Sequence, residues 1–201
     1  MYKRFLKRLA DIFISLTCLF VASFIIIPFL IFVYFKTKEN PFFFQKRTGL
    51  NGRIFTLVKM RTMASKFDSE GNLLPDKERT GSWGKFIREM SIDEIPQLFN
   101  VLTGDMSLIG PRPLLPEYLP LYSDFHRRRH GVRPGISGWA QVNGRNSISW
   151  QQKFNLDVWY VDNVSFKVDL RIFMQTIVKV FGKADINNSE ETTMPPFNGT
   201  N

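Results

Sequence analysis

Two adjacent carboxylates, those of Asp93 and Glu94, are the residues of this sequence best suited to chemistry. They lie in the segment MSIDEIPQLFNVLTGDMSLIGPRP, residues 90–113, which ends in a Gly-Pro-Arg-Pro turn. A carboxylate that attacks an anionic phosphate needs a metal ion or a cation beside it, and this segment can supply both. The alternative is a purely structural role for the same residues at the start of a helix. Ser91 with Glu94 three residues later forms a capping-box pattern, and acids in a first helical turn complement the helix dipole.

The charge balance favours an anionic partner. The chain has 27 Lys and Arg against 18 Asp and Glu, which gives a net charge of +9 and a pI near 9.8. Such a balance suits nucleic acid, an anionic membrane surface or phosphorylated substrates. The single cysteine, Cys18, excludes an intrachain disulfide and gives no sign of an oxidising compartment.

An apolar run from Ile12 to Phe35 predicts insertion into a membrane. It spans about 24 residues without a charge, which is long enough to cross a bilayer. It is too long for a signal peptide and no small-residue cleavage site follows it. A soluble core helix of this length would show a polar face, whereas this run has only scattered Ser and Thr.

The flanks of the apolar run favour a re-entrant topology. Basic residues stand on both sides of it: Lys3, Arg4, Lys7 and Arg8 before, and Lys36, Lys38, Lys46, Arg47 and Arg53 after. Basic flanks mark the cytoplasmic side, so both ends are expected there. Pro28 removes a helical hydrogen bond and bends the axis, so the helix is expected to enter and return through one leaflet. A simple spanning helix is the alternative, because proline also occurs in straight transmembrane helices.

The elements that must position the acidic pair follow from local patterns. Asn51-Gly52 between β-prone runs predicts a hairpin within residues 40–63, and residues 64–84 are polar enough for a loop. A helix is expected to begin at Ser91, with a face formed by Ile92, Ile95, Phe99 and Leu102. Residues 104–150 resemble binding loops, and residues 164–182 predict a basic amphipathic helix that lies in the membrane interface or packs on the core.

These patterns define an α+β fold, mostly helical with a few short strands. Three parts are expected: a membrane-inserted, re-entrant helix at 1–38, a cytoplasmic catalytic domain at the membrane interface at 39–183, and a polar, loosely ordered tail at 184–201.

His126 and His130 are spaced like a zinc pair, with three arginines between them. A zinc site would need a third ligand and usually a glutamate between the histidines, and neither is evident. An exposed basic patch that meets lipid headgroups is the favoured interpretation.

Several motifs, in order, resemble the bacterial sugar transferase family, the small monotopic phosphoglycosyl transferases. They are Val58–Met63, Ser91–Leu98, Asn100–Ser107, Gly110–Pro113, Arg133–Gly138 and Gln141–Arg145, and together they cover nearly the whole chain. Tyr118–Tyr122, Ser149–Phe154 and Phe197–Gly199 are most similar to a subgroup that transfers phospho-N,N'-diacetylbacillosamine to undecaprenyl phosphate for protein glycosylation. One departure concerns the membrane helix: the family usually breaks it at Ser-Pro, whereas here Phe24 follows Ser23 and the only proline of the run is Pro28.

The resemblance implies a two-step reaction. Asp93 would attack the β-phosphorus of a UDP-sugar and release UMP, and undecaprenyl phosphate would then take the sugar phosphate from the aspartate. Glu94 would hold Mg²⁺, with Asp93 as a further candidate ligand. Lys59, Arg88, Arg112 and Arg145 would position phosphates, although each arginine could instead form a surface ion pair. Asp169 matches a carboxylate associated with activity in the family, and Asp157 is a weaker candidate.

The expected partners are a UDP-sugar, undecaprenyl phosphate and the lipids of the bacterial inner membrane at its cytoplasmic face. Another UDP-hexose, such as UDP-galactose or UDP-glucose, is the first alternative. A membrane-tethered basic protein that binds lipid or nucleic acid is a distant second. Nucleic acid is not expected, because most phenylalanines fall in the membrane run or on amphipathic faces rather than among basic residues. The sequence does not indicate an oligomeric state.

Overall fold

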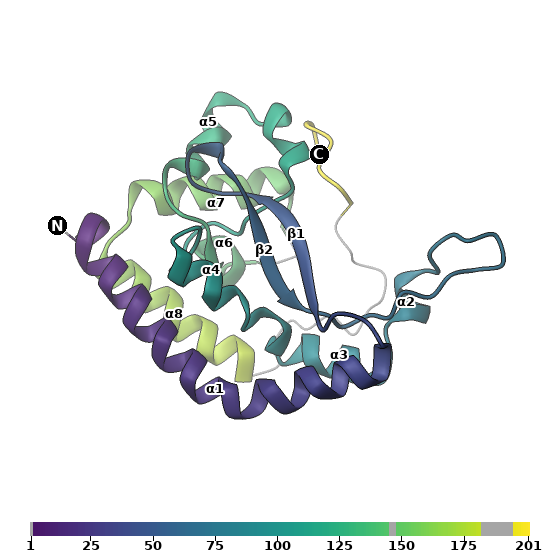
Figure 1. Ribbon diagram of the computed structural model, residues 1–201. Coiled ribbons are helices and arrows are strands. Elements are labelled where there is room, and N and C mark those ends of the chain that lie inside the picture. The colour runs from purple at the N-terminus through teal and green to yellow at the C-terminus, as the bar shows by residue number, and fades with distance from the viewer. Residues whose placement is uncertain (1, 145–147, 182–194) are drawn as a thin grey trace.

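A long bent helix runs along one side of a small α+β body in the computed structural model, which describes residues 2–144, 148–181 and 195–201 (Figure 1). This helix, α1, spans Lys7–Thr37 and follows a short π-helical turn, Tyr2–Leu6. It is long and apolar enough to cross a membrane, and only 11% of its apolar window is buried. Phe13, Phe20 and Phe24 are among its exposed side chains, so the outer surface of α1 suits contact with lipid rather than water.

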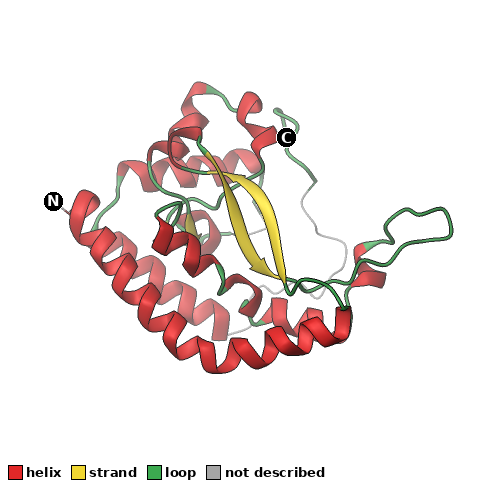
Figure 2. Ribbon diagram, viewed as in Figure 1, coloured by secondary structure: helices red, strands yellow, loops and turns green. Residues whose placement is uncertain are grey.

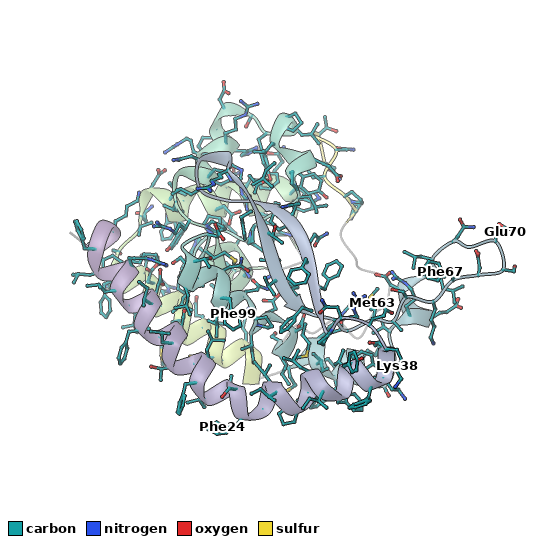
Figure 3. The ribbon with its side chains drawn as sticks, in the orientation of Figure 1. Phe24, Lys38, Met63, Phe67, Glu70 and Phe99 are labelled. Atoms are coloured by element: carbon teal, nitrogen blue, oxygen red, sulfur yellow. The ribbon has the colours of Figure 1, made fainter. Side chains whose placement is uncertain are left out.

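The bend in α1 has an identifiable cause. Figure 3 labels Phe24 at the corner where the helix changes direction. Pro28, four residues later, has no N–H to donate to the carbonyl of Phe24, and its ring crowds that carbonyl. The bend therefore lies close to Ser23, although no Ser-Pro pair is present in this helix.

A β-hairpin crosses the middle of the body, surrounded by helices (Figure 2). Strand β1, Phe42–Thr48, pairs antiparallel with β2, Ile54–Met60, and Phe42 lies opposite Met60. Positive φ angles at Asn51 and Gly52 close the turn, as predicted from the Asn-Gly pair. A second, parallel pair joins β3, Ser107–Ile109, to β4, Gly135–Ser137.

The remaining helices are short, except for two near the C-terminus. They are α2 (Asp76–Arg79), α3 (Ser82–Glu89), α4 (Gln97–Thr103), α5 (Asp124–Arg127), α6 (Trp139–Val142), α7 (Trp150–Asp162) and α8 (Phe166–Phe181). The helix expected at residues 164–182 is therefore confirmed as α8, and the α+β fold with few short strands is confirmed as well.

Some local expectations are wrong. The segment 64–84 is not only a loop, because α2 and the start of α3 lie in it; its tip, marked by Phe67 and Glu70 in Figure 3, projects from the body. The helix α7 was not expected at all. The described end of the tail, residues 195–201, is docked rather than loose, because Phe197 is buried in an aromatic cluster with Tyr118 and Trp150.

Four apolar clusters form the core of the described residues, and two of them include residues of the hairpin. In one of these two, Ile26 and Val33 of α1 pack with Met60 of β2 and Ile87 of α3. In the next, Phe55 and Leu57 of β2 pack with Val101 of α4. Strand β2 is thus held between α1 and α4, and its C-terminal end is fixed beside the start of α4.

Candidate active site

The acidic pair lies in a 3₁₀ turn, Ile92–Glu94, just before α4. Ser91 precedes the turn with φ +54° and makes no side-chain cap hydrogen bond. The capping-box interpretation is therefore wrong, and so is a single helix that begins at Ser91. Pro96 stands at the N-cap of α4, where its missing N–H costs nothing.

Lys59 and Arg112 meet Glu94 from two separate elements. Lys59 Nζ lies 2.9 Å from Glu94 Oε1 and 3.5 Å from Asp93 Oδ2. Arg112 Nη2 donates to the same Oε1 at 2.7 Å. The side chains of Asp93 and Glu94 are only 12% and 18% exposed, so these charges act through a partly desolvated medium in which they are strong.

A side-chain clamp fixes β2 to α4, and thereby Lys59 to the acidic turn. Asn100 of α4 accepts from the backbone N–H of Val58 at 3.0 Å and donates to the carbonyl of Thr56 at 2.8 Å. Because Asn100 is buried, both bonds are shielded from water.

Tertiary contacts fix the backbone at Arg112, and thereby the position from which its side chain extends. It follows Gly110-Pro111, and a Cβ on Gly110 would lie 2.4 Å from the carbonyl oxygen of Arg133, so only glycine fits there. Arg129 Nη2 donates to the carbonyl of Arg112 at 2.8 Å and also pairs with Asp157 Oδ2 at 2.7 Å. Asp157 thus lies behind the turn rather than against Glu94.

The neighbouring charges give the two carboxyls different properties. Burial raises the pKa of Glu94, but the charges of Arg112 and Lys59 outweigh it and bring that pKa down to about 2. Burial raises the pKa of Asp93 above its usual value, and the charge of Lys59 opposes this only in part.

Of the other predicted site residues, Arg88 lies near the acidic pair, whereas Asp169 bonds to other elements. Arg88 donates to Thr62 Oγ1 at 2.8 Å and makes no hydrogen bond to Asp93, although its charge lowers the pKa of that carboxyl. Asp169 accepts from Tyr2, Lys7 and Tyr160 and joins α8 to the start of the chain. Arg145 lies outside the described residues.

The basic patch around His130 is smaller than predicted. His126, Arg129 and His130 are buried, and Arg129 is ion-paired. Only Arg127 and Arg128 of this run are exposed, and Arg128 pairs with Asp162.

Two residues of the site were missed in the sequence, Arg47 and Gln97. They line a small cleft together with Lys59 and Arg112, beside Leu57 and Pro113. The predicted hairpin itself could have indicated Arg47. In the antiparallel register Arg47 lies opposite Phe55 and Gln45 lies opposite Leu57. Because residues two apart on a strand share a face, Arg47 and Lys59 lie on the same face of the hairpin.

The residues present fit a magnesium ion shared with a substrate. The described parts of the chain contain no cluster of three His, Cys, Asp or Glu side chains that could hold a metal alone. Magnesium is usually held by one or two carboxylates together with substrate phosphates, and Asp93 and Glu94 supply that number.

Comparison with known proteins shows the family of this chain. Residues 2–183 match the family model described as bacterial sugar transferase. "Uncharacterized sugar transferase EpsL" of Bacillus subtilis is 52% identical over 97% of this chain and 96% of the relative. "Undecaprenyl-phosphate galactose phosphotransferase" of Salmonella typhimurium is 34% identical over 86% of this chain but only 40% of its own length. "UDP-glucose:undecaprenyl-phosphate glucose-1-phosphate transferase" of Xanthomonas campestris is 36% identical over 73% of this chain and 33% of its own length. The resemblance to the family and the expectation of a phosphoglycosyl transferase enzyme are confirmed, whereas the subgroup stays a prediction. The chain belongs to the bacterial sugar transferase family.

Proposed function

We propose that this protein transfers a sugar 1-phosphate from a UDP-sugar to undecaprenyl phosphate, with Asp93 as the nucleophile. The observation that carries the proposal is the largely buried Asp93–Glu94 pair with Lys59 and Arg112 directed at it. The names of the Salmonella and Xanthomonas relatives, which transfer galactose phosphate and glucose phosphate to the same lipid, support it.

The reaction has two steps at phosphorus. A carboxylate oxygen of Asp93 attacks the β-phosphorus of the UDP-sugar, and the bond from that phosphorus to the bridging oxygen breaks, which releases UMP. An oxygen of undecaprenyl phosphate then attacks the same phosphorus and displaces Asp93, which leaves a lipid diphosphosugar. Lys59 and Arg112 place positive charge where the phosphate oxygens gain negative charge.

The other cations and the metal support the same step. Arg88 adds charge near Asp93, and Arg145 is proposed for a phosphate on the strength of the family motif. Glu94, with Asp93 as a further ligand, would hold Mg²⁺, which when bound neutralises charge on the diphosphate. Despite burial, the charges of Arg112 and Lys59 lower the pKa of Glu94 to about 2, so this carboxylate stays ionised well below neutral pH.

The identity of the transferred sugar is a separate question from the reaction. N,N'-Diacetylbacillosamine 1-phosphate for protein glycosylation is proposed because three short segments are similar to that subgroup. Galactose and glucose are the competing sugars, since they appear in the names of relatives. A panel of these UDP-sugars, read by released UMP, separates the three.

The proposed location is the cytoplasmic face of the bacterial inner membrane. The exposed apolar surface of α1 and its corner at Phe24 support a re-entrant helix. Exposed Phe166, Leu170 and Met174 on α8 support an interfacial position for that helix too.

Intact mass spectrometry tests the covalent step. The protein mixed with a UDP-sugar and no lipid should gain the mass of one sugar phosphate, and the Asp93→Asn variant should gain nothing, because an amide is a poor nucleophile. Asp105→Asn, an acidic residue outside the pair, is the matched control and should keep the adduct. If Asp93→Asn still turned over at more than a trace, a direct single displacement would replace the covalent mechanism.

A further inference from the structure

The guanidinium of Arg47 lies in the small cleft between the hairpin and the turn that carries Arg112. Its Nη2 donates to Gln45 Oε1 at 2.6 Å, and its Nη1 reaches the carbonyl of Pro113 at 3.5 Å. Its Nε is shielded from solvent and has no hydrogen-bond partner. A donor of Arg47 is therefore left unused inside the site.

Arg47 also differs from the cations around it in having no carboxylate. Lys59 and Arg112 both pair with Glu94, and Arg129 pairs with Asp157. Among the ion pairs of the described residues, none includes Arg47. Its described hydrogen bonds go to neutral oxygens, so no carboxylate of the described residues lies within ion-pair distance of its charge.

A partly buried charge without an ion-pair partner costs free energy, and the positive charge of Arg112 nearby raises that cost for Arg47. Burial and then the neighbouring charge of Arg112 lower the pKa of Arg47, and Tyr118 and Glu94 oppose this only in part. The two guanidinium groups carry like charges, so they repel each other. A bound anion would remove that repulsion and satisfy the free Nε. Arginine's planar fork suits phosphate in particular.

We propose that the cleft lined by Arg47, Lys59, Gln97 and Arg112 binds a phosphate group of a substrate beside Glu94, with Arg47 as its cationic anchor. This inference rests on the proposed function and adds a binding residue to it. The phosphate is either one of the UDP-sugar diphosphate or that of undecaprenyl phosphate, and the two half-reactions tell them apart.

Arg47→Gln is compared with Arg53→Gln, which removes an exposed arginine from the turn of the same hairpin. In the first arm, UMP release is followed with the active UDP-sugar and no lipid. In the second arm, the preformed adduct is chased with increasing undecaprenyl phosphate. Arg47→Gln should lose at least about tenfold in kcat/KM in one arm, while Arg53→Gln stays near wild type in both. A loss in the first arm assigns the UDP-sugar phosphate, and a loss in the second assigns the lipid phosphate.

Inorganic phosphate gives a readout that does not depend on turnover. It should raise the melting temperature of the wild type and of Arg53→Gln but not that of Arg47→Gln. If Arg47→Gln does not fold, Arg47→Lys takes its place, since it keeps the charge and loses the fork. The inference is overturned if the folded Arg47 variant keeps both half-reactions within about twofold and keeps the phosphate shift. A wild type that forms no adduct with any UDP-sugar would instead defeat the proposed function, and the phosphate shift would then decide the cleft alone.

Discussion

Asp93 and Glu94 are neighbours in sequence but have different electrostatic environments. Glu94 receives two charged hydrogen bonds at one oxygen, which keeps it ionised. Asp93 has a single ion pair among the described residues, with Lys59 at 3.5 Å, and its pKa is raised by burial despite the charges of Lys59 and Arg88. A carboxylate held tightly by hydrogen bonds is a weaker nucleophile than one held loosely. The geometry therefore favours Asp93 for attack and Glu94 for binding cations.

The sequence could identify the charged residues of the site but not the contacts that hold them in place. Motif order pointed to Asp93, Glu94, Lys59 and Arg112, and the structure brings these four together. No local pattern could show that Arg129 supports the backbone of Arg112, because that contact depends on tertiary packing.

Replacing Arg112 should lower activity without detaching the protein. Arg112→Ala removes one of the two cations on Glu94 and is expected to reduce kcat/KM by about 10²-fold, as loss of one preorganised donor does elsewhere. Arg112→Lys keeps the charge but loses the fork, so it should still cost about tenfold. Transfer assays and membrane fractionation measure the two effects. Release of Arg112→Ala from membranes with activity intact would contradict a place in the phosphate site.

His130 should make stability depend on pH. Burial and the charge of Arg129 lower its pKa to about 4 from 6.5 in the unfolded chain. Between these values the unfolded chain binds more protons, so the free energy of unfolding falls as pH drops through the window. The loss from pH 7.5 to pH 5 should be about 2 kcal/mol. Denaturant melts in detergent at both pH values measure it, and His130→Gln should lose correspondingly less. Equal losses in both proteins would refute the assignment.

At the scale of elements, some boundaries follow from the sequence and others do not. Asn51-Gly52 supplies the positive φ angles of the hairpin turn directly. Ser91 also adopts φ +54°, yet serine has little preference for that region, so the break before α4 depends on packing. The helix α7 had a readable signal in its Ser149–Gln152 capping box, but buried Asp157 among its apolar residues obscures the helical pattern.

The bend of α1 leads to a prediction about topology. With a corner at Phe24 and basic flanks, residues 3 and 38 should lie on the same, cytoplasmic side. Lys3→Cys and Lys38→Cys, each in a Cys18→Ser background, should resist a membrane-impermeant thiol reagent in intact cells and react after permeabilisation. Labelling of one position only in intact cells would show a spanning helix. Adding Pro28→Ala restores the hydrogen bond to Phe24 and should move a measurable fraction of molecules to that form.

At the scale of the whole molecule, polar contacts link the long apolar helix α1 to the rest of the protein. Arg8 of α1 donates to the carbonyls of Val101 and Leu102 at the C-terminal end of α4, where a cation also complements the helix dipole. Asp11 accepts from Ser107 at 2.8 Å. The long apolar helix α1 is thus bonded to α4, the helix that follows the acidic pair. If α1 lies in the membrane as proposed, these bonds fix the height of the site relative to it.

Asp169 is part of the contacts that link α1 to the rest of the protein. Its replacement should lower the stability of the fold but not the rate of the reaction in folded molecules. It accepts from Lys7 at 2.7 Å and from Tyr2 at 2.6 Å, and its side chain is 8% exposed, so Asp169→Asn breaks a nearly buried ion pair. The free energy of unfolding should fall by about 3 kcal/mol. Well below the lowered melting temperature, the rate of adduct formation per folded molecule should stay close to wild type, unlike that of Asp93→Asn.

The matched control for this test is Asp162→Asn, which breaks the exposed pair with Arg128. An exposed pair contributes little, so its melting temperature should barely change. Thermal melts and intact mass spectrometry on the same samples give both readouts. Because Asp169 makes its described hydrogen bonds to Tyr2, Lys7 and Tyr160, loss of adduct should only follow loss of fold. If Asp169→Asn kept the wild-type melting temperature but lost the adduct, Asp169 would act on the reaction itself rather than as a tie between α8 and the membrane helix.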